Sequence, residues 1–444
     1  MHRTSLIGHV VELHAAVVSS RHPADSEVRN FLRPRHYLGS RDRRFITEVL
    51  YGMLRHHRIL HERVRLASGL LGPGGLQPSS LVLYAAFAIG VASEKESAVE
   101  ADIAPLCSVY LRGIDCGSLL AALAGADPLA DPSLTPEARI SLSAALPEFM
   151  VREWYRRYGG EETDALCRAL NQPAPTTARV NTLQGSVDHC LEQLAKEGVS
   201  CRRTQLSPSG IVFEKRINIQ SLSAFRRGLF EMQDEGSQLI SLLVEPPPGG
   251  FVVDACAGGG GKTLHLAALM AGRGKLAAIE VSTRRLGNMR ERIRRAGAGM
   301  VSTYSAEEDR DDIASWKGEA DAVLVDAPCT GIGTFRRNPG ARLTVTEQFL
   351  EAVSATQRMI LHRYADLVRP GGRLVYSTCT LLRKENEDVV EEFLGARPEF
   401  TLLPAKDILH RQGVAIGADS PFMELFPHRH GTDGFFAAVL TRLR

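Results

Sequence analysis

From Phe251 to Leu269 the chain reads Phe-Val-Val-Asp-Ala-Cys-Ala-Gly-Gly-Gly-Gly-Lys-Thr-Leu-His-Leu-Ala-Ala-Leu, and this stretch decides the fold. A short apolar run ends in the acid Asp254, a glycine-rich turn follows, and a helical pattern then begins. Glycine lets a backbone approach a ligand closely and adopt positive φ. The N-terminus of a helix directs free N–H groups toward the loop before it. The stretch therefore predicts a strand, a ligand-binding loop and a helix.

Two kinds of ligand suit such a loop. A nucleoside triphosphate requires the pattern G-x-x-x-x-G-K-[ST], and the chain has Gly261-Lys262-Thr263 but Cys256 in place of the first glycine. A later apolar strand that ends in Asp326 could supply a magnesium-binding acid. S-adenosylmethionine instead requires an acid after the next strand to bind the ribose hydroxyls, and Glu280 stands at about that distance. A glycine-rich turn without a ligand is the third alternative.

Composition narrows the class of protein. A chain of 444 residues predicts two or three domains, and a hydrophobic fraction of 44% is ordinary for a globular protein. The net charge of +2 indicates no nucleic-acid partner by itself, but the arginines cluster, and guanidinium groups suit phosphate contacts. The alternative is that these arginines lie on solvated helix faces, above all those at 284–295, where the acid Glu291 stands between them. The three groups are Arg29, Arg33, Arg35, Arg41, Arg43, Arg44, Arg55, Arg58, Arg63 and Arg65; Arg284, Arg285, Arg290, Arg292, Arg294 and Arg295; and Arg336 with Arg337.

The cysteines and the apolar runs indicate the cellular compartment of the protein. None of the eight cysteines is part of a C-x-x-C pair, so we expect no structural zinc. Glu12 and His14 stand where a secretory signal would have its apolar core. The longest apolar run, Leu81 to Ala92, is too short to cross a bilayer. We therefore expect a cytoplasmic protein with reduced thiols and no membrane partner.

Residues 1–140 predict an all-α domain with one basic edge, because apolar residues recur at helical spacing. One expected helix begins near Asp42 and continues toward Leu66, and the run Gly72-Pro73-Gly74-Gly75 predicts a break. Residues 141–245 mix helical patterns with strand-like segments at 177–183 and 210–213, which predicts a small α/β subdomain.

Residues 246–444 alternate strands and helices at βαβ spacing, which predicts an α/β domain with a Rossmann-like, doubly wound sheet. Ligands of such sheets bind beyond the carboxyl ends of the strands. The expected strands are 251–254, 276–280, 300–304, 322–326 and 373–376, with a final pair near Phe400 and at 435–440.

Two adjacent strand ends carry cysteines. The fourth strand ends in Asp326-Ala-Pro-Cys329, and the fifth ends in Tyr376-Ser-Thr-Cys379. A lone buried cysteine is usually structural, but two at ligand-side strand ends favour catalysis. A thiolate that adds to carbon 6 of a pyrimidine makes carbon 5 nucleophilic toward a sulfonium methyl group. An acid such as Asp326 can hydrogen-bond the cytosine edge, and a second cysteine can assist product release.

These motifs resemble the Nop/Sun family of RNA cytosine-carbon-5 methyltransferases, and in particular its RsmB-type members. Residues 254–262 are similar to the family's D-x-C-A-A-P-G-G-K loop, and 326–331 with Arg336-Arg337-Asn338-Pro339 are similar to D-A-P-C-S-x-x-G…R-R-x-P. Residues 376–380 with 385–387 are similar to Y-[SA]-T-C-[ST]…E-N. Residues 179–181, 233–235 and 430–436 also match, so the resemblance covers nearly the whole chain.

The resemblance implies roles for single residues. Cys379 is expected to be the nucleophile, Cys329 the release cysteine, and Asp326 the third catalytic residue. The family's loop has Ala-Pro where this chain has Gly258-Gly259, and Ser305 follows the third strand where the family has an aspartate. The residues expected to bind S-adenosylmethionine are Cys256, Ala257, Gly258, Gly259, Gly260, Gly261, Lys262, Glu280, Ser305 and Asp326.

The resemblance also implies an architecture and a function. Residues 1–140 resemble a NusB-like RNA-binding domain, 141–245 an RNA-binding subdomain, and 246–444 the methyltransferase domain. We expect methyl transfer to carbon 5 of a cytidine in RNA, with small-subunit ribosomal RNA as the substrate class, by a monomer that does not act on DNA. The alternative is a non-catalytic RNA-binding assembly or antitermination factor that has a methyltransferase-like fold.

Overall fold

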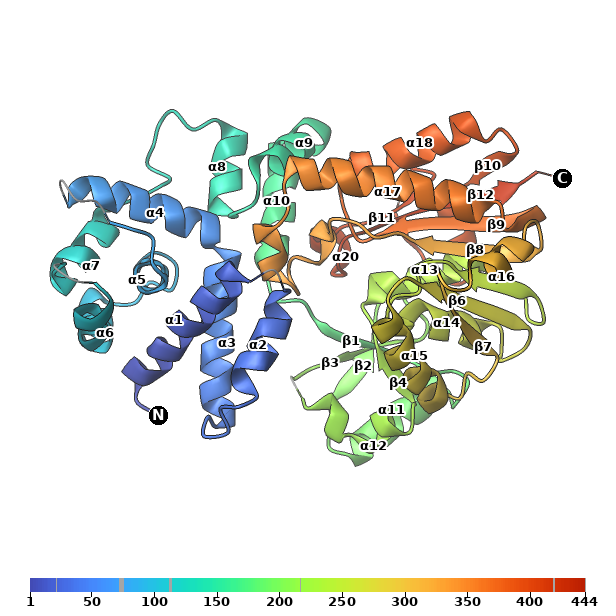
Figure 1. Cartoon of the computed structure of the whole chain (residues 1–444), viewed down its shortest axis with the longest axis horizontal. Coiled ribbons are helices and arrows are strands. Elements are labelled where there is room, and N and C mark those ends of the chain that lie inside the picture. The colour runs from blue at the N-terminus through green and yellow to red at the C-terminus, as the bar shows by residue number, and fades with distance from the viewer. Residues whose placement is uncertain (21, 72–75, 112–113, 216, 418–419, 444) are drawn as a thin grey trace. The chain divides into compact units, whose positions relative to one another are not determined.

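The computed structural model describes residues 1–20, 22–71, 76–111, 114–215, 217–417 and 420–443. Contacts divide the chain into two units (Figure 1). The helical unit comprises Met1–Gln172 and Phe335–Glu347, and the sheet unit comprises Pro173–Thr334 and Gln348–Arg444. The three-part division at residues 140 and 245 stays a prediction, and the break expected at Gly72–Gly75 lies outside the described residues. No helix among the described residues is long and apolar enough to cross a membrane.

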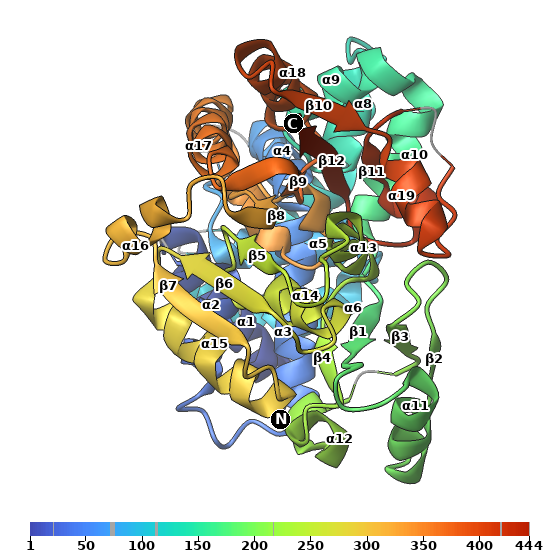
Figure 2. The same ribbon diagram turned by 90° about the vertical axis from the view of Figure 1, so that its right-hand side faces the viewer.

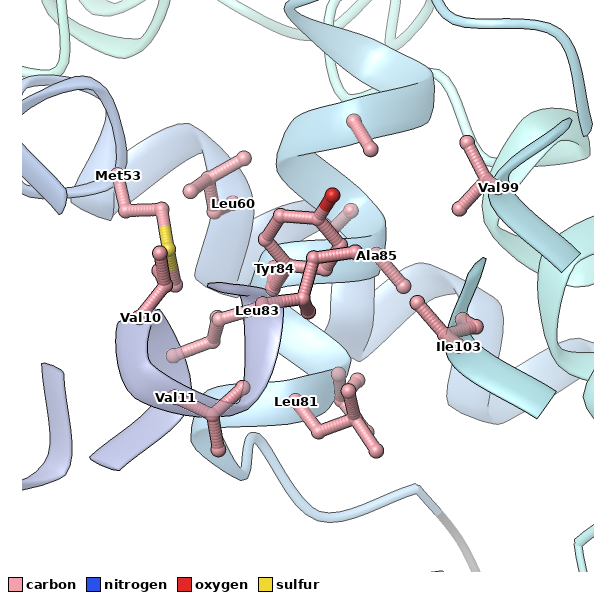
Figure 3. Packing of buried hydrophobic residues seen from close by; sticks show 14 of the residues in the cluster. Val10, Val11, Met53, Leu60, Leu81, Leu83, Tyr84, Ala85, Val99 and Ile103 are labelled. Atoms are coloured by element: carbon pink, nitrogen blue, oxygen red, sulfur yellow. The ribbon is translucent and has the colours of Figure 1, made fainter. Parts of the chain in front are cut away.

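The helical unit is built around α5. This helix is apolar on almost every side, and such a helix is stable only when neighbouring helices surround it. Tyr84 of α5 lies among Val10, Leu60 and Ile103, which come from three other helices (Figure 3). The helices are α1 Arg3–Ser19, α2 Ala24–Leu32, α3 Ser40–Arg55, α4 His57–Leu70, α5 Ser80–Gly90, α6 Glu96–Tyr110, α7 Cys116–Gly125, α8 Pro136–Ser143, α9 Glu148–Tyr158 and α10 Gly160–Asn171.

The single helix expected from Asp42 toward Leu66 is wrong, because the chain forms α3 and α4 with a break at His56. His56 has φ −107° and ψ 13°, outside the helical region. The buried residues Met53, Leu60 and Val64 keep helical spacing across the break, so the apolar periodicity gives no sign of it.

Several of the clustered N-terminal arginines are engaged within the helical unit. Arg43 donates to the carbonyl oxygens of Leu38 and Arg35, each at 2.9 Å, and Arg63 donates to that of Leu123 at 2.8 Å. These guanidinium groups stabilise the helical unit from within. Four others form ion pairs: Arg35 with Glu12, Arg44 with Glu48, Arg58 with Glu148, and Arg65 with Glu62.

A segment from late in the chain completes the helical unit. Its 3₁₀ helix η3, Pro339–Leu343, carries Arg342, which is buried. Burial and the charge of Arg55 lower the pKa of Arg342 to about 9. The Arg342 guanidinium donates to the carbonyl oxygens of Arg55, Ala144 and Leu170 at 2.9, 3.3 and 2.8 Å, and to Asn171 Oδ1 at 2.6 Å.

Acid should destabilise the helical unit through His14. Burial, with a smaller contribution from His61, lowers the pKa of His14 from 6.5 to about 4. Below pH 6.5 the unfolded chain binds a proton that the folded unit rejects. The free energy of unfolding should therefore fall as the pH drops from 6.5 to 4, by about 3 kcal/mol for this one group.

The measurement is thermal unfolding between pH 7.5 and 4, followed by the fluorescence of Trp154 in a Trp316→Phe background. His14 Nδ1 lies 2.9 Å from Ser80 Oγ. We expect a lower Tm at the acid end, and a flatter dependence of Tm on pH after His14→Gln, since glutamine can keep a hydrogen bond to Ser80 without titrating. Equal pH dependence in both variants would contradict the assignment.

In the sheet unit, residues 176–232 form a small antiparallel sheet with strand order β2-β3-β1-β4. The strands expected at 177–183 and 210–213 are confirmed, and the two outer strands were not expected. The strands are β1 Thr176–Val180, β2 Cys201–Arg203, β3 Gly210–Phe213 and β4 Phe230–Met232, and the helices are α11 Val187–Lys196 and α12 Ser223–Arg226.

The rest of the sheet unit forms an eight-stranded sheet of order β10-β12-β9-β8-β5-β6-β7, with β11 paired to β12. The pairs from β9 to β7 are parallel, and β12 and β10 are antiparallel. All the expected strands are confirmed, and β11 was not expected. The strands are β5 Phe251–Asp254, β6 Lys275–Glu280, β7 Val301–Ser305, β8 Ala320–Asp326, β9 Val368–Thr378, β10 Phe400–Leu403, β11 Met423–Leu425 and β12 Phe435–Arg442.

Helices cover both faces of this sheet, as a doubly wound fold requires. Alternate residues along each strand point to opposite faces, so Val252 packs with α13, α14 and α19 while Val253 packs with α16, α17 and α18. Helix α15 lies beside β6 and β7 (Figure 2). The helices are α13 Glu235–Val244, α14 Gly261–Leu269, α15 Thr283–Ala296, α16 Arg310–Ser315, α17 Glu347–Ala365, α18 Glu387–Ala396, α19 Ala405–Arg411 and α20 Pro427–His430.

Candidate active site

The glycine-rich loop leaves the carboxyl end of β5 and runs directly into α14, as the sequence predicts. Gly258 has φ +56° and Gly260 φ +81°, conformations that other residues rarely adopt. The loop is tied to the next strand, because the N–H of Ala257 donates to the carbonyl oxygen of Ile279 at 2.9 Å. Its last residue, Gly261, begins the helix, so free N–H groups of α14 face the loop.

A cavity of about 240 Å³ opens beside this loop. Its lining includes seven of the residues expected to bind the cofactor: Cys256, Ala257, Gly258, Gly259, Gly261, Lys262 and Asp326. Met232, Gln233 and Arg292 also line it, and the sequence analysis did not select them as site residues. Cavity and loop therefore form one site at the carboxyl ends of the parallel strands.

Lys262 and Asp326 connect the loop to the neighbouring strand β8. Lys262 Nζ lies 2.7 Å from Asp326 Oδ2, and Ser377 Oγ donates to Asp326 Oδ1 at 2.9 Å. Burial lowers the pKa of Lys262, but the nearby carboxylate of Asp326 has the larger opposite effect. The pKa of Lys262 is therefore raised above 10.5. At the end of β5, burial raises the pKa of Asp254 to about 7, although the Thr263 hydroxyl donates a hydrogen bond to its carboxyl group at 2.7 Å.

The two cysteines expected at adjacent strand ends are in contact. Strands β8 and β9 are parallel neighbours, with Asp326 opposite Ser377 in the register. Cys329 Sγ lies 3.2 Å from Cys379 Sγ, and the backbone N–H of Cys379 donates to Cys329 Sγ at 3.4 Å. The hydrogen bond with Cys379 and burial raise the pKa of Cys329 well above 9. Both effects favour the neutral form of the Cys329 thiol.

The Glu385 carboxylate accepts hydrogen bonds from both loops that carry the cysteines. Its Oε1 accepts from the Thr330 N–H at 2.7 Å and from Gln357 Nε2 at 3.0 Å. Its Oε2 accepts from the hydroxyl groups of Thr330 and Thr380 at 2.6 and 2.7 Å. Each threonine directly follows a cysteine, so one carboxylate fixes both loops. The sequence showed Glu385 only as part of a matching motif, without this role.

Arg179 of β1 supports the glycine-rich loop from the small sheet. It is buried, with Nε donating to Gln233 Oε1 at 2.7 Å and Nη2 to the carbonyl oxygen of Gly261 at 3.4 Å. Burial lowers the pKa of Arg179 to about 9, although Glu231 opposes the shift. Motif matches at 179–181 and 233–235 were the signal that could have located this support.

Glu280 and Ser305 end neighbouring strands and lie opposite each other in the register of β6 and β7. Glu280 is buried, accepts from the Ser282 N–H at 2.9 Å and lies 3.6 Å from Arg285. Ser305 Oγ accepts from the Glu308 N–H at 3.2 Å, so its hydroxyl is engaged in a local turn. The two side chains lie outside the lining of the cavity, and their roles stay predictions.

Comparison with known proteins shows that the chain is similar to ribosomal RNA methyltransferases. Residues 241–441 match the family model described as 16S rRNA methyltransferase RsmB/F, and residues 146–220 match its ferredoxin-like domain. The chain is 31% identical over 320 residues to a Bacillus subtilis protein named "Probable ribosomal RNA small subunit methyltransferase B", which covers 71% of this chain and 70% of that protein.

Two solved structures are similar to the structure of this chain. PH0851 superposes with a TM-score of 0.78 at 27% identity and covers 99% of each chain. NSun6 from Pyrococcus horikoshii, solved with SFG, has a TM-score of 0.58 at 25% identity, and the match covers 66% of this chain and 97% of that chain. The similarity therefore extends over the sheet unit and its glycine-rich loop.

Proposed function

Because the chain belongs to the RsmB/F family of 16S rRNA methyltransferases, we propose that it transfers a methyl group from S-adenosylmethionine to carbon 5 of a cytidine in small-subunit ribosomal RNA. The observation that supports this most directly is the pair of thiols 3.2 Å apart beside Lys262 and Asp326. Methyl transfer to a carbon that is not itself nucleophilic requires such a thiol.

The residues present fit S-adenosylmethionine. The loop of residues 256–262 gives a cradle with two positive-φ glycines, and Gly258 has no heavy atom within 4 Å of where a Cβ would lie. Glu280 offers a buried carboxylate for ribose hydroxyls. When bound, the cofactor supplies a methyl group on a positively charged sulfur.

We assign the attack to Cys379. Its Sγ forms a bond to carbon 6 of the base, and carbon 5 gains the electron pair that takes the methyl group. This choice between the two thiols follows the match of residues 376–380 to the family motif Y-[SA]-T-C-[ST]. Asp326 can hydrogen-bond the cytosine edge and favour protonation of the ring nitrogen, with the Lys262 ammonium balancing its charge.

We assign product release to Cys329. Once Cys379 is a thioether, its hydrogen bond no longer raises the pKa of Cys329, and Cys329 can lose its proton to solvent. The resulting thiolate takes the proton from carbon 5, and the bond between Cys379 Sγ and carbon 6 breaks. The electron pair of that bond returns to Cys379 Sγ, which restores the nucleophile.

Bisulfite mapping of ribosomal RNA, with and without the gene, tests this function. We expect one or more cytidines protected from deamination only when the gene is present, and methylation of the same RNA by the purified protein with S-adenosylmethionine. An increase in Tm with ATP and none with S-adenosylmethionine would instead support the nucleoside-triphosphatase alternative.

Removing the Glu280 carboxylate should weaken cofactor binding. We expect Glu280→Ala to raise the Kd for S-adenosylmethionine about tenfold or more, since a hydrogen bond to a charged group contributes about 1.5–3 kcal/mol. Isothermal calorimetry measures this, and circular dichroism checks the fold. Glu280→Gln, which keeps one acceptor oxygen, should bind with intermediate affinity. An unchanged Kd for Glu280→Ala would refute the ribose-binding role.

We further propose that residues 1–140 act as a NusB-like RNA-binding domain and residues 141–245 as a second RNA-binding part, in a cytoplasmic monomer. The exposed arginines Arg33 and Arg41 support the first assignment. RNA binding should weaken with salt, and Arg33→Glu with Arg41→Glu should reduce the slope of log K against log salt by about one to two. Arg369→Glu, which changes an exposed arginine outside both proposed RNA-binding parts that already pairs with Asp321, is the control.

A further inference from the structure

We propose that Arg292 is a positioning residue that holds the glycine-rich loop in its cofactor-binding shape. This inference rests on cofactor binding at the loop, and it concerns a side chain that has no part in the chemistry assigned above. Arg292 lies on α15, half-buried, and lines the cavity together with Gly259.

Arg292 connects the loop to a buried carboxylate. Its Nη1 donates to the carbonyl oxygen of Gly259. Its Nε and Nη2 donate to Glu231 Oε2 at 3.2 and 2.9 Å. Glu231 belongs to β4 of the small sheet and is 2% exposed. Because this carboxylate is fixed, the guanidinium is held in one orientation, and Gly259 is held with it.

The loop needs such a support because four glycines, Gly258 to Gly261, follow one another. Glycine loses more conformational freedom on ordering than any other residue, so this loop is costly to fix in one shape. Gly260 packs on α15, since a Cβ there would lie 2.7 Å from Met289 Cγ. Arg292, one turn farther along the same helix, then holds the preceding carbonyl group.

A side chain at position 259 would crowd the Arg292 contact. A Cβ on Gly259 would lie 3.1 Å from Arg292 Nη1, closer than ordinary contact. The φ of Gly259 is outside the positive range, so an L-residue fits its backbone. A stiffer residue at 259 should therefore order the loop by itself and make Arg292 dispensable.

The test is calorimetry of S-adenosylmethionine binding to the full chain and its variants. Arg292→Met should raise the Kd about tenfold or more, from loss of a charge-assisted hydrogen bond, and Arg292→Lys should recover part of it. Gly259→Pro should bind with equal affinity whether or not Arg292→Met is also present. At saturating cofactor, kcat of Arg292→Met should match the wild type, with the effect confined to KM for S-adenosylmethionine.

Arg295→Met is the matched control. Arg295 also pairs with Glu231 but does not reach the loop, so its loss should leave the Kd unchanged. Equal losses in Arg295→Met and Arg292→Met would show that the Glu231 ion pair matters only for the fold. Additive losses in Gly259→Pro with Arg292→Met, or a wild-type Kd for Arg292→Met, would overturn the proposal. Failure of the wild type to bind S-adenosylmethionine would instead refute the proposed function.

Discussion

Cys379→Ala should abolish methyl transfer and leave the RNA free, whereas Cys329→Ala should trap the protein on its RNA. Without Cys379, no bond to carbon 6 forms, and carbon 5 stays unreactive. Without Cys329, attack and methyl transfer proceed, but proton removal from carbon 5 is slow and the thioether persists. The two thiols are 3.2 Å apart, so the opposite outcomes would reflect chemistry rather than location.

A denaturing gel of each variant with labelled target RNA and S-adenosylmethionine measures both results. We expect a slow-migrating adduct only with Cys329→Ala. An adduct only with Cys379→Ala would reverse the two roles. Full turnover by both variants would exclude the covalent mechanism. Cys201→Ala, which changes a cysteine of the small sheet, controls for general effects of thiol removal.

Glu385→Gln should reduce kcat about a hundredfold without unfolding the protein. Both carboxylate oxygens of Glu385 accept hydrogen bonds, whereas glutamine has an NH₂ group in place of one oxygen. That NH₂ group would face donors, so at least one hydrogen bond that holds Thr330 or Thr380 is lost. Misplacement of reacting groups by about 1 Å can lower a rate by about a hundredfold. The unsatisfied donor should also lower the free energy of unfolding by about 1–3 kcal/mol.

Steady-state kinetics at saturating RNA and cofactor, with chemical denaturation of each variant, test this role. Glu392→Gln is the control, because Glu392 is an exposed acid on α18 that pairs with Arg358. Loss of stability with unchanged kcat would mean that Glu385 stabilises the fold but does not position the cysteines.

The parallel sheet and the glycine-rich loop could be predicted because their signals are local. Apolar runs that end in an acid, such as 251–254, specify both the strand and the place where it ends. The meeting of Cys329 and Cys379 followed from one rule, that parallel neighbours present their carboxyl ends at the same edge. The strands β2 and β4 are only three residues long, too short for an alternating pattern to show.

Other parts of the site depend on partners that are distant in sequence. Arg292 was one of six arginines on a predicted helix, and nothing local separates it from Arg294, which is exposed. Its role comes from Glu231, 61 residues earlier in the chain. The four hydrogen bonds of Glu385 likewise join three separate segments. Such contacts exist only after the sheet has aligned its strands, so periodicity and spacing cannot give them.

The dependence of the helical unit on Arg342 has a consequence for synthesis on the ribosome. The acceptor Asn171 precedes Arg342 by 171 residues. At roughly 5–20 residues per second, the nascent chain waits on the order of ten to thirty seconds between the two. During that time α10 and the end of α3 are present, but the guanidinium that caps their carbonyl groups is still missing. Helices α3 and α10 therefore reach their final packing only after Arg342 has left the tunnel.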